Sequence, residues 1–274
     1  MRLTLAHSAD ADDAFMCHAL SKGLVDTGDL EFEEVIADIQ TLNERAMWGE
    51  YEVSAVSCYA YARVSGRYVL SASGASVGDG YGPIVVSKDA AFAKGRDCVI
   101  AVPGRNTTAC LLTQLWAPEA AQVCLPFDRV MEAVTDEAVT AGVLIHEGQL
   151  TYEDAGLIKA VDLGEWWQAQ TGLPTPLGCV VMRRDLPLAL RKSVATAIKA
   201  SVRYALEHRE EALESAMRWA RGMSPERAAA FVGMYVNEFT LDLGDRGRRG
   251  LERLFDEAYT TGLLGTVPTV ELVG

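Results

Sequence analysis

The fold is decided by residues 81–88, YGPIVVSK, in which a Gly-Pro turn leads into an apolar, β-branched run. Such a run predicts a buried strand. A similar run, CVVMRRDL, occupies residues 179–186. Because no Pro/Ser-rich linker divides the chain, two lobes would have to be joined by strands that cross between them, and these two runs are the best candidates. The sequence therefore predicts an inner lobe, residues 87–185, inserted into an outer lobe made of residues 1–86 and 186–274.

Up to residue 185 the chain alternates short β-like runs with short helix-like runs. This alternation is typical of an α/β protein with largely parallel sheets. The expected strands are residues 2–7, 30–37, 51–56, 81–87, 97–104, 139–146, 156–163 and 177–184, and the expected helices are residues 12–23, 39–50, 107–117 and 127–137.

After Asp185 the pattern changes to helix only. Apolar residues recur at every fourth position, on one face of the first segment, at Leu190, Val194, Ile198, Val202 and Leu206. Ser224 and Pro225 then stand where the N-cap and the first residue of a further helix are expected. These helices are predicted to be packing elements.

The composition excludes several classes of partner. The chain has 274 residues, 49% of them hydrophobic, and a formal net charge of −13. That charge repels phosphate backbones and anionic lipid surfaces, and Lys and Arg form no dense cluster, so no nucleic acid and no membrane is expected as a partner. The six cysteines form no C-x-x-C pair, as is typical of buried free thiols. Without a signal-peptide core or a membrane-length apolar run, the sequence predicts a soluble, cytoplasmic protein.

Polar clusters follow four of the expected strands, and ligands of open α/β sheets bind beyond the carboxyl ends of strands. The first cluster, HSADADDAF at residues 7–15, offers Asp12 and Asp13. Either acid fits a helix cap, since acidic side chains suit the positive end of a helix dipole. The alternative is a metal site on Asp10, Asp12 and Asp13, but the spacing and glycine of a calcium loop are missing. No Cys/His metal spacing appears elsewhere, so no metal site is predicted.

The second and third clusters suit an anion. Ser54 and Ser57 lie where a strand turns into a helix, and a serine there is either a helix cap or a donor to a bound carboxylate. In residues 101–110, AVPGRNTTAC, a strand and a Pro-Gly turn lead to polar residues that open an apolar helix. These residues are Asn106, Thr107 and Thr108. No Gly-Lys-Ser/Thr follows, so a carboxylate fits this turn better than a nucleoside triphosphate.

The fourth cluster contains His146, in VLIHEGQLTY at residues 143–152. A lone histidine at a strand end is most often a hydrogen-bonded structural residue, but an imidazole also suits general base catalysis at neutral pH. On spacing alone both interpretations stay open. His7, at the end of the first expected strand, could line the same cleft. Trp166 and Trp167 either pack under the hinge or form the floor of a site for an aromatic ligand.

The chain resembles the 1,4-dihydroxy-6-naphthoate synthases of the futalosine route to menaquinone. The resemblance covers nearly the whole chain and rests on the order and spacing of DIQTLNERAMWGEYEVSAVS, YGPIVVSK, AVPGRNTTA, AGVLIHEGQLTY, VDLGEWWQAQTGLPTPLG and YVNEFTLDLG. It implies an α/β, two-lobed periplasmic-binding-protein-like type II fold with a ligand cleft between the lobes and a C-terminal helical segment. One loop departs from the family, because many members have SPCPND where this chain has SADADD, so that Asp10 replaces a cysteine.

The resemblance also implies site residues. The histidine of the family's IHE motif is the proposed base, and here it is His146. The Asp of the family's first loop matches Asp13. The family's contacts to the substrate carboxylate carry over to Asn43 in TLN, to Ser57 after SAV, and to Thr107 and Thr108 in the TT pair.

The function that the resemblance implies is that of a carbon–carbon lyase in menaquinone biosynthesis. Such an enzyme converts cyclic dehypoxanthine futalosine, a small-molecule carboxylate substrate, to 1,4-dihydroxy-6-naphthoate, and it needs no metal or organic cofactor. Two alternatives share the fold: the chorismate dehydratase of the same pathway, and a non-catalytic small-carboxylate-binding protein. The LIHEGQLTY segment favours the naphthoate synthase over the dehydratase. The missing signal peptide argues against a receptor that works outside the cytoplasm.

Overall fold

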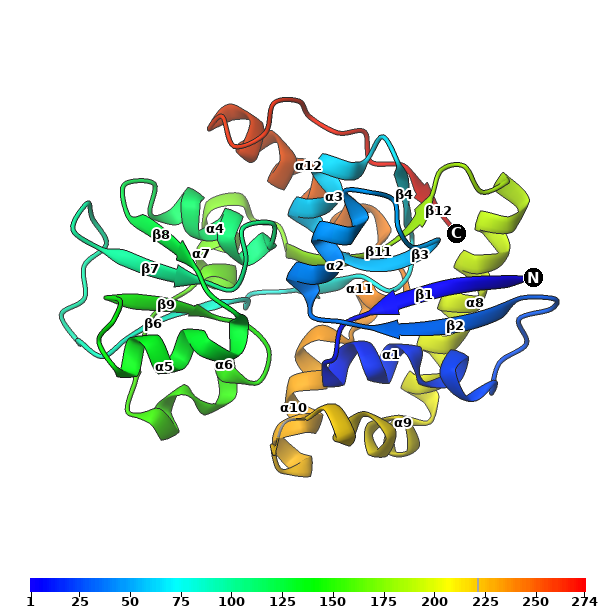
Figure 1. Cartoon of the computed structure of the whole chain (residues 1–274), viewed down its shortest axis with the longest axis horizontal. Coiled ribbons are helices and arrows are strands. Elements are labelled where there is room, and N and C mark those ends of the chain that lie inside the picture. Colours follow the sequence, from blue (N-terminus) through cyan, green and yellow to red (C-terminus); the bar gives the residue numbers. More distant parts are fainter. Residues whose placement is uncertain (221) are drawn as a thin grey trace.

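The computed structural model describes residues 1–220 and 222–274, which form two lobes, each built on its own β-sheet (Figure 1). The inner lobe, coloured green, lies at the left of Figure 1, and the outer lobe, which carries both ends of the chain, lies at the right. The α/β class and the two-lobed arrangement predicted from the sequence are therefore confirmed.

The sheet of the outer lobe is mixed. It contains β1 (Arg2–His7), β2 (Glu31–Ile36), β3 (Val53–Ser57), β4 (Tyr68–Ser71), β5 (Ser76–Gly78), β11 (Thr175–Arg183) and β12 (Leu272–Val273). The order is β12-β4-β11-β3-β1-β2, and β5 also pairs with β11. β1 is parallel to β2 and to β3, whereas β11 is antiparallel to β3, β4 and β5. A strand from late in the chain thus lies in the middle of the outer sheet.

The sheet of the inner lobe is also mixed. It contains β6 (Ile84–Ser87), β7 (Val99–Val102), β8 (Ala121–Cys124), β9 (Ala141–Leu144) and β10 (Ile158–Asp162), in the order β10-β6-β9-β7-β8. β7 is parallel to β8 and β9, but β6 is antiparallel to β9 and β10. The sheets are mixed rather than largely parallel because the strands next to the connections between the lobes run against their neighbours.

The connections between the lobes lie earlier in the chain than the sequence predicts. β6 lies wholly in the inner sheet and β11 wholly in the outer sheet. By sheet membership the chain crosses within residues 79–83 and 163–174, ahead of the expected boundaries at 86/87 and 185/186. The cause is strand pairing, since β6 pairs with β9 and β10, and β11 fills the space between β3 and β4.

The helices include all those expected from the sequence. Their bounds are α1 Ala11–Lys22, α2 Ile39–Ala46, α3 Cys58–Val64, α4 Thr108–Trp116, α5 Val130–Thr135, α6 Gly148–Thr151, α7 Leu163–Thr171, α8 Leu188–Glu207, α9 Arg209–Ala216, α10 Pro225–Tyr235, α11 Glu238–Leu241 and α12 Gly244–Thr260. The predicted cap of α10 is confirmed, because the Ser224 hydroxyl accepts a hydrogen bond from the Arg227 N–H and Pro225 is the first residue. α8 packs on α1, and of its predicted apolar face Val194, Ile198 and Val202 are buried while Leu190 and Leu206 are partly buried.

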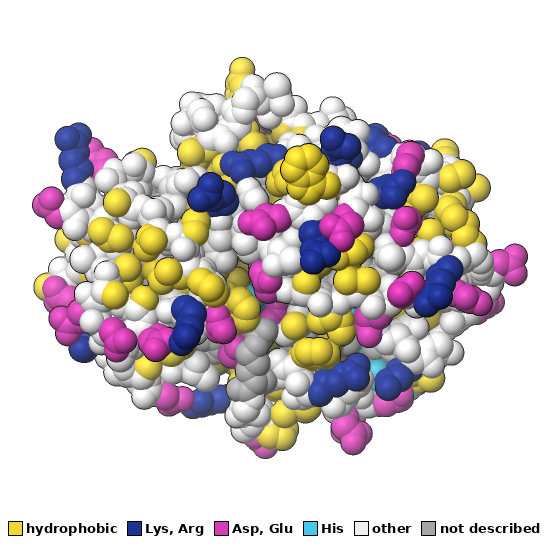
Figure 2. All heavy atoms as spheres, in the orientation of Figure 1, with side chains coloured by type: hydrophobic (Ala, Val, Ile, Leu, Met, Phe, Trp, Pro, Cys, Tyr) yellow, Lys and Arg dark blue, Asp and Glu magenta, His cyan; other side chains and the backbone are white. Residues whose placement is uncertain are grey.

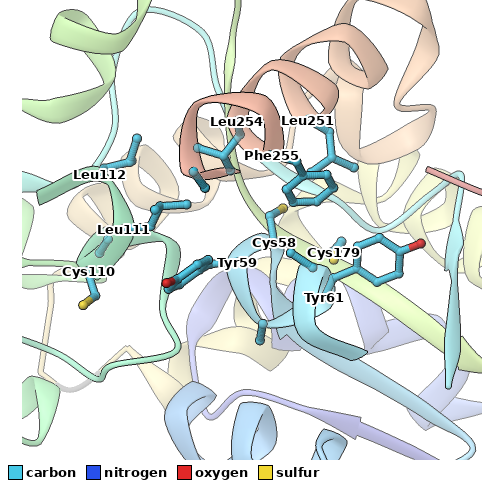
Figure 3. Close-up of a cluster of buried hydrophobic side chains, with 14 of the residues drawn as sticks. Cys58, Tyr59, Tyr61, Cys110, Leu111, Leu112, Cys179, Leu251, Leu254 and Phe255 are labelled. Atoms are coloured by element: carbon cyan, nitrogen blue, oxygen red, sulfur yellow. The ribbon is translucent and has the colours of Figure 1, made fainter. Parts of the chain in front are cut away.

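One cluster of buried apolar side chains extends through both lobes. Figure 3 shows side chains of α3 and α12, from the outer lobe, beside side chains of α4, from the inner lobe. They include Tyr59 and Tyr61 of α3, Leu251, Leu254 and Phe255 of α12, and Leu111 and Leu112 of α4. Because buried apolar area is the main source of stability, this shared cluster holds the lobes against each other.

The surface in Figure 2 carries both signs of charge. On the face shown, Lys and Arg side chains are scattered among Asp and Glu side chains. Among the described residues, no helix is both long and apolar enough to cross a membrane. Each of the six cysteines lies in the described part of the chain and is a free thiol.

Candidate active site

A cavity of about 100 Å³ lies between the lobes. The outer lobe lines it with the β1–α1 turn, the end of β3, part of β11 and α10, and the inner lobe with the start of α4 and the turn after β9. Of the residues expected from the sequence, Asp13, Ser57, Thr107, Thr108 and His146 line it. Pockets for drug-sized ligands have volumes of roughly 300 Å³ or more. The cavity is thus smaller than the space that a ligand of that size fills.

The start of α4 brings anion-binding groups to the cavity. Thr107 is the N-cap: its hydroxyl accepts a hydrogen bond from the Cys110 N–H (3.1 Å) and donates one to a carbonyl of the preceding turn (2.7 Å). The Thr108 hydroxyl donates to a carbonyl of β11 (2.6 Å). Both hydroxyl protons are thus already donated to carbonyl groups of the protein. The backbone N–H groups of Thr108 and Ala109, which like all first-turn N–H groups have no partner inside the helix, remain for a ligand.

Ser57 supplies a further donor. Its N–H donates to Asn43 Oδ1 (2.8 Å), and Asn43 Nδ2 donates to Ser57 Oγ (2.9 Å). Because Oγ accepts this hydrogen bond, its own proton can be donated into the cavity. Asn43 is fully buried behind Ser57, so the structure places it as a support for Ser57 and not in the cavity lining. Ser54, on the same strand, is buried and its hydroxyl donates to the Ala55 carbonyl (3.0 Å).

His146 follows β9 and lines the inner-lobe side of the cavity. Its Nδ1 lies 3.2 Å from Asp10 Oδ2, and its ring meets the Phe127 ring edge-on at 5.0 Å between centroids. The Asp10 side chain is only 2% exposed and the His146 side chain 14%. A carboxylate in this position accepts a hydrogen bond from Nδ1–H and favours the tautomer with a bare Nε2. The contact with Asp10 thus fixes the orientation of the imidazole.

The backbone of His146 is in the left-handed region, with φ of 57°. This conformation is uncommon for a residue other than glycine and costs on the order of 1–3 kcal/mol. Strain of this kind clusters at ligand and active sites, where surrounding contacts hold it. Here the Asp10 and Phe127 side chains contact the imidazole from two directions and hold the turn after β9.

Three aspartates, Asp10 just before α1 and Asp12 and Asp13 in its first turn, are placed in different ways. Asp13 Oδ2 accepts two hydrogen bonds from Ser8, one from the N–H and one from the hydroxyl, both 2.7 Å. Asp10 stands at the N-cap position of α1, but its carboxylate faces His146. Asp12 is buried, and burial together with the charges of Asp13 and Asp10 raises its pKa well above the ordinary value. Within the described residues, no three His, Cys, Asp or Glu side chains are placed to hold a metal ion.

His7, Trp166 and Trp167 lie outside the cavity lining. His7 is buried, with Nδ1 2.8 Å from the Ser8 carbonyl and Nε2 2.9 Å from Glu34 Oε1. Burial alone would lower the pKa of His7, but its partners, Glu34 foremost, raise it, and the same contact lowers the pKa of Glu34 to about 2. Trp167 is buried and donates its indole N–H to a backbone carbonyl (3.1 Å), and Trp166 packs on the same core. Both tryptophans are packing residues.

Among the cavity residues that the sequence does not predict, two form a hydrogen bond between the lobes. The Tyr235 hydroxyl of α10 donates to Gln149 Oε1 at 2.8 Å, so that a buried hydrogen bond joins the lobes across the cavity. Gln149 stands one helical turn after His146, and that spacing was the available signal. No local pattern placed Tyr235 in the cavity, because it reaches the cavity from a helix far along the chain.

Two α/β lobes that are joined by crossing segments and enclose a cavity define a protein of the periplasmic-binding-protein-like class. A Candida albicans protein with the generic periplasmic binding protein fold matches with a TM-score of 0.71 at 12% identity, over 97% of this chain and 92% of that chain. That likeness shows the fold alone. The chain belongs to the menaquinone biosynthesis family, whose model matches residues 3–260.

Relatives within this family match along nearly their whole length. The chain is 41% identical to the 1,4-dihydroxy-6-naphthoate synthase of Thermus thermophilus over 97% of both chains. A crystal structure of a protein from Archaeoglobus fulgidus matches with a TM-score of 0.92 at 47% identity, over 96% of this chain and 98% of that chain. The family expected from the sequence motifs is thereby confirmed, and with it a place in menaquinone biosynthesis.

Proposed function

We propose that this protein is a carbon–carbon lyase of the futalosine route, which converts cyclic dehypoxanthine futalosine to 1,4-dihydroxy-6-naphthoate. The observation that carries the proposal is the shared cavity: the imidazole of His146 and the donors of Ser57, Thr108 and Ala109 line one buried space between the lobes. A base and a carboxylate site side by side suit a substrate that carries a carboxylate at one end and loses a proton at the other.

The carboxylate of the substrate is held by uncharged donors. The cavity lining includes no Lys or Arg among the described residues. The Ser57 hydroxyl and the Thr108 and Ala109 N–H groups, at the positive end of α4, supply the compensation. When the lobes close, water is excluded and these hydrogen bonds become stronger because the local dielectric constant falls.

The proposed reaction starts at Nε2 of His146. Neutral His146 removes a proton from a hydroxyl group of the sugar-derived part of the substrate. The electron pair left on that oxygen forms a carbonyl group in the departing fragment as the carbon–carbon bond to the ring system breaks. The electron pair of the broken bond passes into the ring system, which becomes aromatic, and a ring oxygen gains negative charge before it is protonated to a naphthol hydroxyl. A small triose-type fragment leaves as a carbonyl compound. The step has no net oxidation, so it requires no redox partner.

The proposal is tested by incubating the purified protein with cyclic dehypoxanthine futalosine and following 1,4-dihydroxy-6-naphthoate by chromatography with mass detection. We expect catalytic turnover to that product. Conversion of chorismate instead would identify the dehydratase. Stoichiometric binding with the ligand returned unchanged would identify a binding protein, and either result would contradict the proposal.

We expect Ser57→Ala to weaken substrate binding. The variant loses a hydrogen bond to a charged group, worth about 1.5–3 kcal/mol, so KM should rise roughly 10–100-fold while kcat changes less. Ser54→Ala is the matched control, because Ser54 lies on the same buried strand but bonds only to a neighbouring carbonyl. Steady-state kinetics of both variants check this, and an equal rise in KM for the two would place the effect in the strand and not in the ligand contact.

A further inference from the structure

The proposed reaction gives no role to Asp12. It lies in the first turn of α1, lines the cavity, and is 8% exposed. Its Oδ1 is buried and, within the described residues, has no hydrogen-bond partner. A buried polar atom without a partner costs free energy, and in a ligand cavity the missing partner is commonly a group of the ligand.

Both neighbouring aspartates face nitrogen or hydroxyl partners, whereas Asp12 Oδ1 has no hydrogen-bond partner within the described residues. Asp10 faces the His146 imidazole, and Asp13 accepts two hydrogen bonds from Ser8. Asp12 lies between these two negative charges in a cavity whose described lining has no Lys or Arg. Burial first, and then the charges of Asp13 and Asp10, raise the pKa of Asp12 well above its ordinary value, and backbone hydrogen bonds offset this only in part.

The titratable groups near Asp12 do not supply a positive charge of their own. Tyr235, on α10, and Cys17, further along α1 itself, are near enough to sense its charge, and burial raises the pKa of both. His146, on the inner lobe, is engaged by Asp10. A proton on Asp12 is thus the simplest way to reduce the negative charge of a cavity that receives a carboxylate ligand.

We propose that Asp12 is a neutral carboxylic acid that donates a hydrogen bond from its side chain to a ligand oxygen in the cavity. This deepens the proposed function and rests on it, because the oxygen concerned is the ring oxygen that gains negative charge when His146 takes up the proton. A donor that is fixed before the reaction stabilises such an oxygen more in the transition state than in the ground state. His146 accepts the proton, and Asp12 stabilises the charge left behind.

The protonation state is tested first, without substrate. Infrared spectra of the wild type and of Asp12→Asn at neutral pH should differ by the carbonyl band of a protonated carboxylic acid, present only in the wild type. Asp13→Asn, a neighbouring carboxylate with two hydrogen-bond donors, is the control and should leave the band in place. A wild type without the band, or a band that survives in Asp12→Asn, would overturn the inference whether or not the protein turns over cyclic dehypoxanthine futalosine.

Stability against pH gives a second readout without substrate. The folded-state pKa of Asp12 is raised above the unfolded value of about 3.9. The folded protein therefore holds a proton that the unfolded chain has released, and this contribution to stability is lost as the pH rises through the folded pKa. Asp12→Asn cannot lose a proton. Its urea midpoint relative to the wild type should therefore rise between about pH 5 and about pH 8, and a constant difference would contradict a protonated Asp12.

The catalytic role is tested by two substitutions. Asp12→Ala removes the donor and should lower kcat by roughly 10²–10³-fold. Asp12→Asn keeps an N–H donor at the same place, so it should restore kcat to within about tenfold of the wild type and abolish any loss of activity at alkaline pH that Asp12 causes. Full activity of Asp12→Ala, or an Asp12→Asn variant as inactive as Asp12→Ala, would overturn the role. An inactive wild type would instead count against the proposed function and leave the infrared result to stand.

Discussion

Replacing His146 by Asn is expected to lower kcat by roughly 10²–10⁴-fold, the usual contribution of a general base, while substrate binding changes little. The carboxylate donors at Ser57, Thr108 and Ala109 are untouched by this change, so the ligand should still be held. Asn is chosen because His146 has a φ of 57°, and Asn tolerates the left-handed region better than most residues other than glycine. The loss would then report the missing imidazole and not a distorted turn.

The measurement is single-turnover kinetics of the wild type and His146→Asn, with ligand affinity determined by calorimetry. His146→Ala is a useful companion, because it removes the same base but adds the cost of alanine at a positive φ. The two variants should therefore lose similar activity, with His146→Ala the less stable of the two. Product formation at the wild-type rate by His146→Asn would exclude the imidazole as the base.

Gly164→Ala is expected to destabilise the protein by more than about 3 kcal/mol, an effect at the upper end for a small-to-large change. A Cβ at Gly164 would lie 2.0 Å from the carbonyl carbon and oxygen of Tyr81. The atoms it meets are backbone and not the end of a flexible side chain, so the two segments have to move apart. Tyr81 lies in the first crossing between the lobes and Gly164 in the second, so the strain falls where the lobes are joined.

Urea unfolding followed by circular dichroism measures this effect. Gly66→Ala is the matched control, because a Cβ there meets nothing within 4 Å and its φ is not in the left-handed region. We expect the control to keep the wild-type midpoint to within about 0.5 kcal/mol. A Gly164→Ala variant as stable as Gly66→Ala would show that the crossings can separate without loss, and the close contact would then not determine the position of the lobes.

The sequence predicts most of the elements but not how they pair. Periodicity and capping locate α8 and α10, because these signals are local. The strands β4, β5, β8 and β12 escape prediction because they are short and are stabilised by pairing with other strands. Strand direction and the positions of the crossings depend on partners far apart in the chain. Local patterns do not contain that information.

The same limit applies to the candidate site. Strand ends and helix starts identified Ser57, Thr107 and Thr108 as cavity residues, because an anion site at a helix start is a local feature. The Asp10–His146 contact joins a turn of the outer lobe to a turn of the inner lobe, so it exists only in the folded and closed protein. The TLN motif assigned Asn43 to the site. Its position behind Ser57 could not be predicted from its place in α2, because that position depends on how α2 packs against β3.

Because β11 lies in the middle of the outer sheet, that sheet can be completed only after the strands of the inner lobe have been synthesised. The strands of the inner lobe, β6 to β10, are contiguous in the chain and can pair as soon as they have left the ribosome. The N-terminal strands β1 to β4 are synthesised earlier, yet β3 and β4 lack their common partner until β11 emerges and pairs with both. The lobe whose first strands are made first is therefore completed last, and until then the edges of β3 and β4 that β11 will cover are open to pairing with other strands.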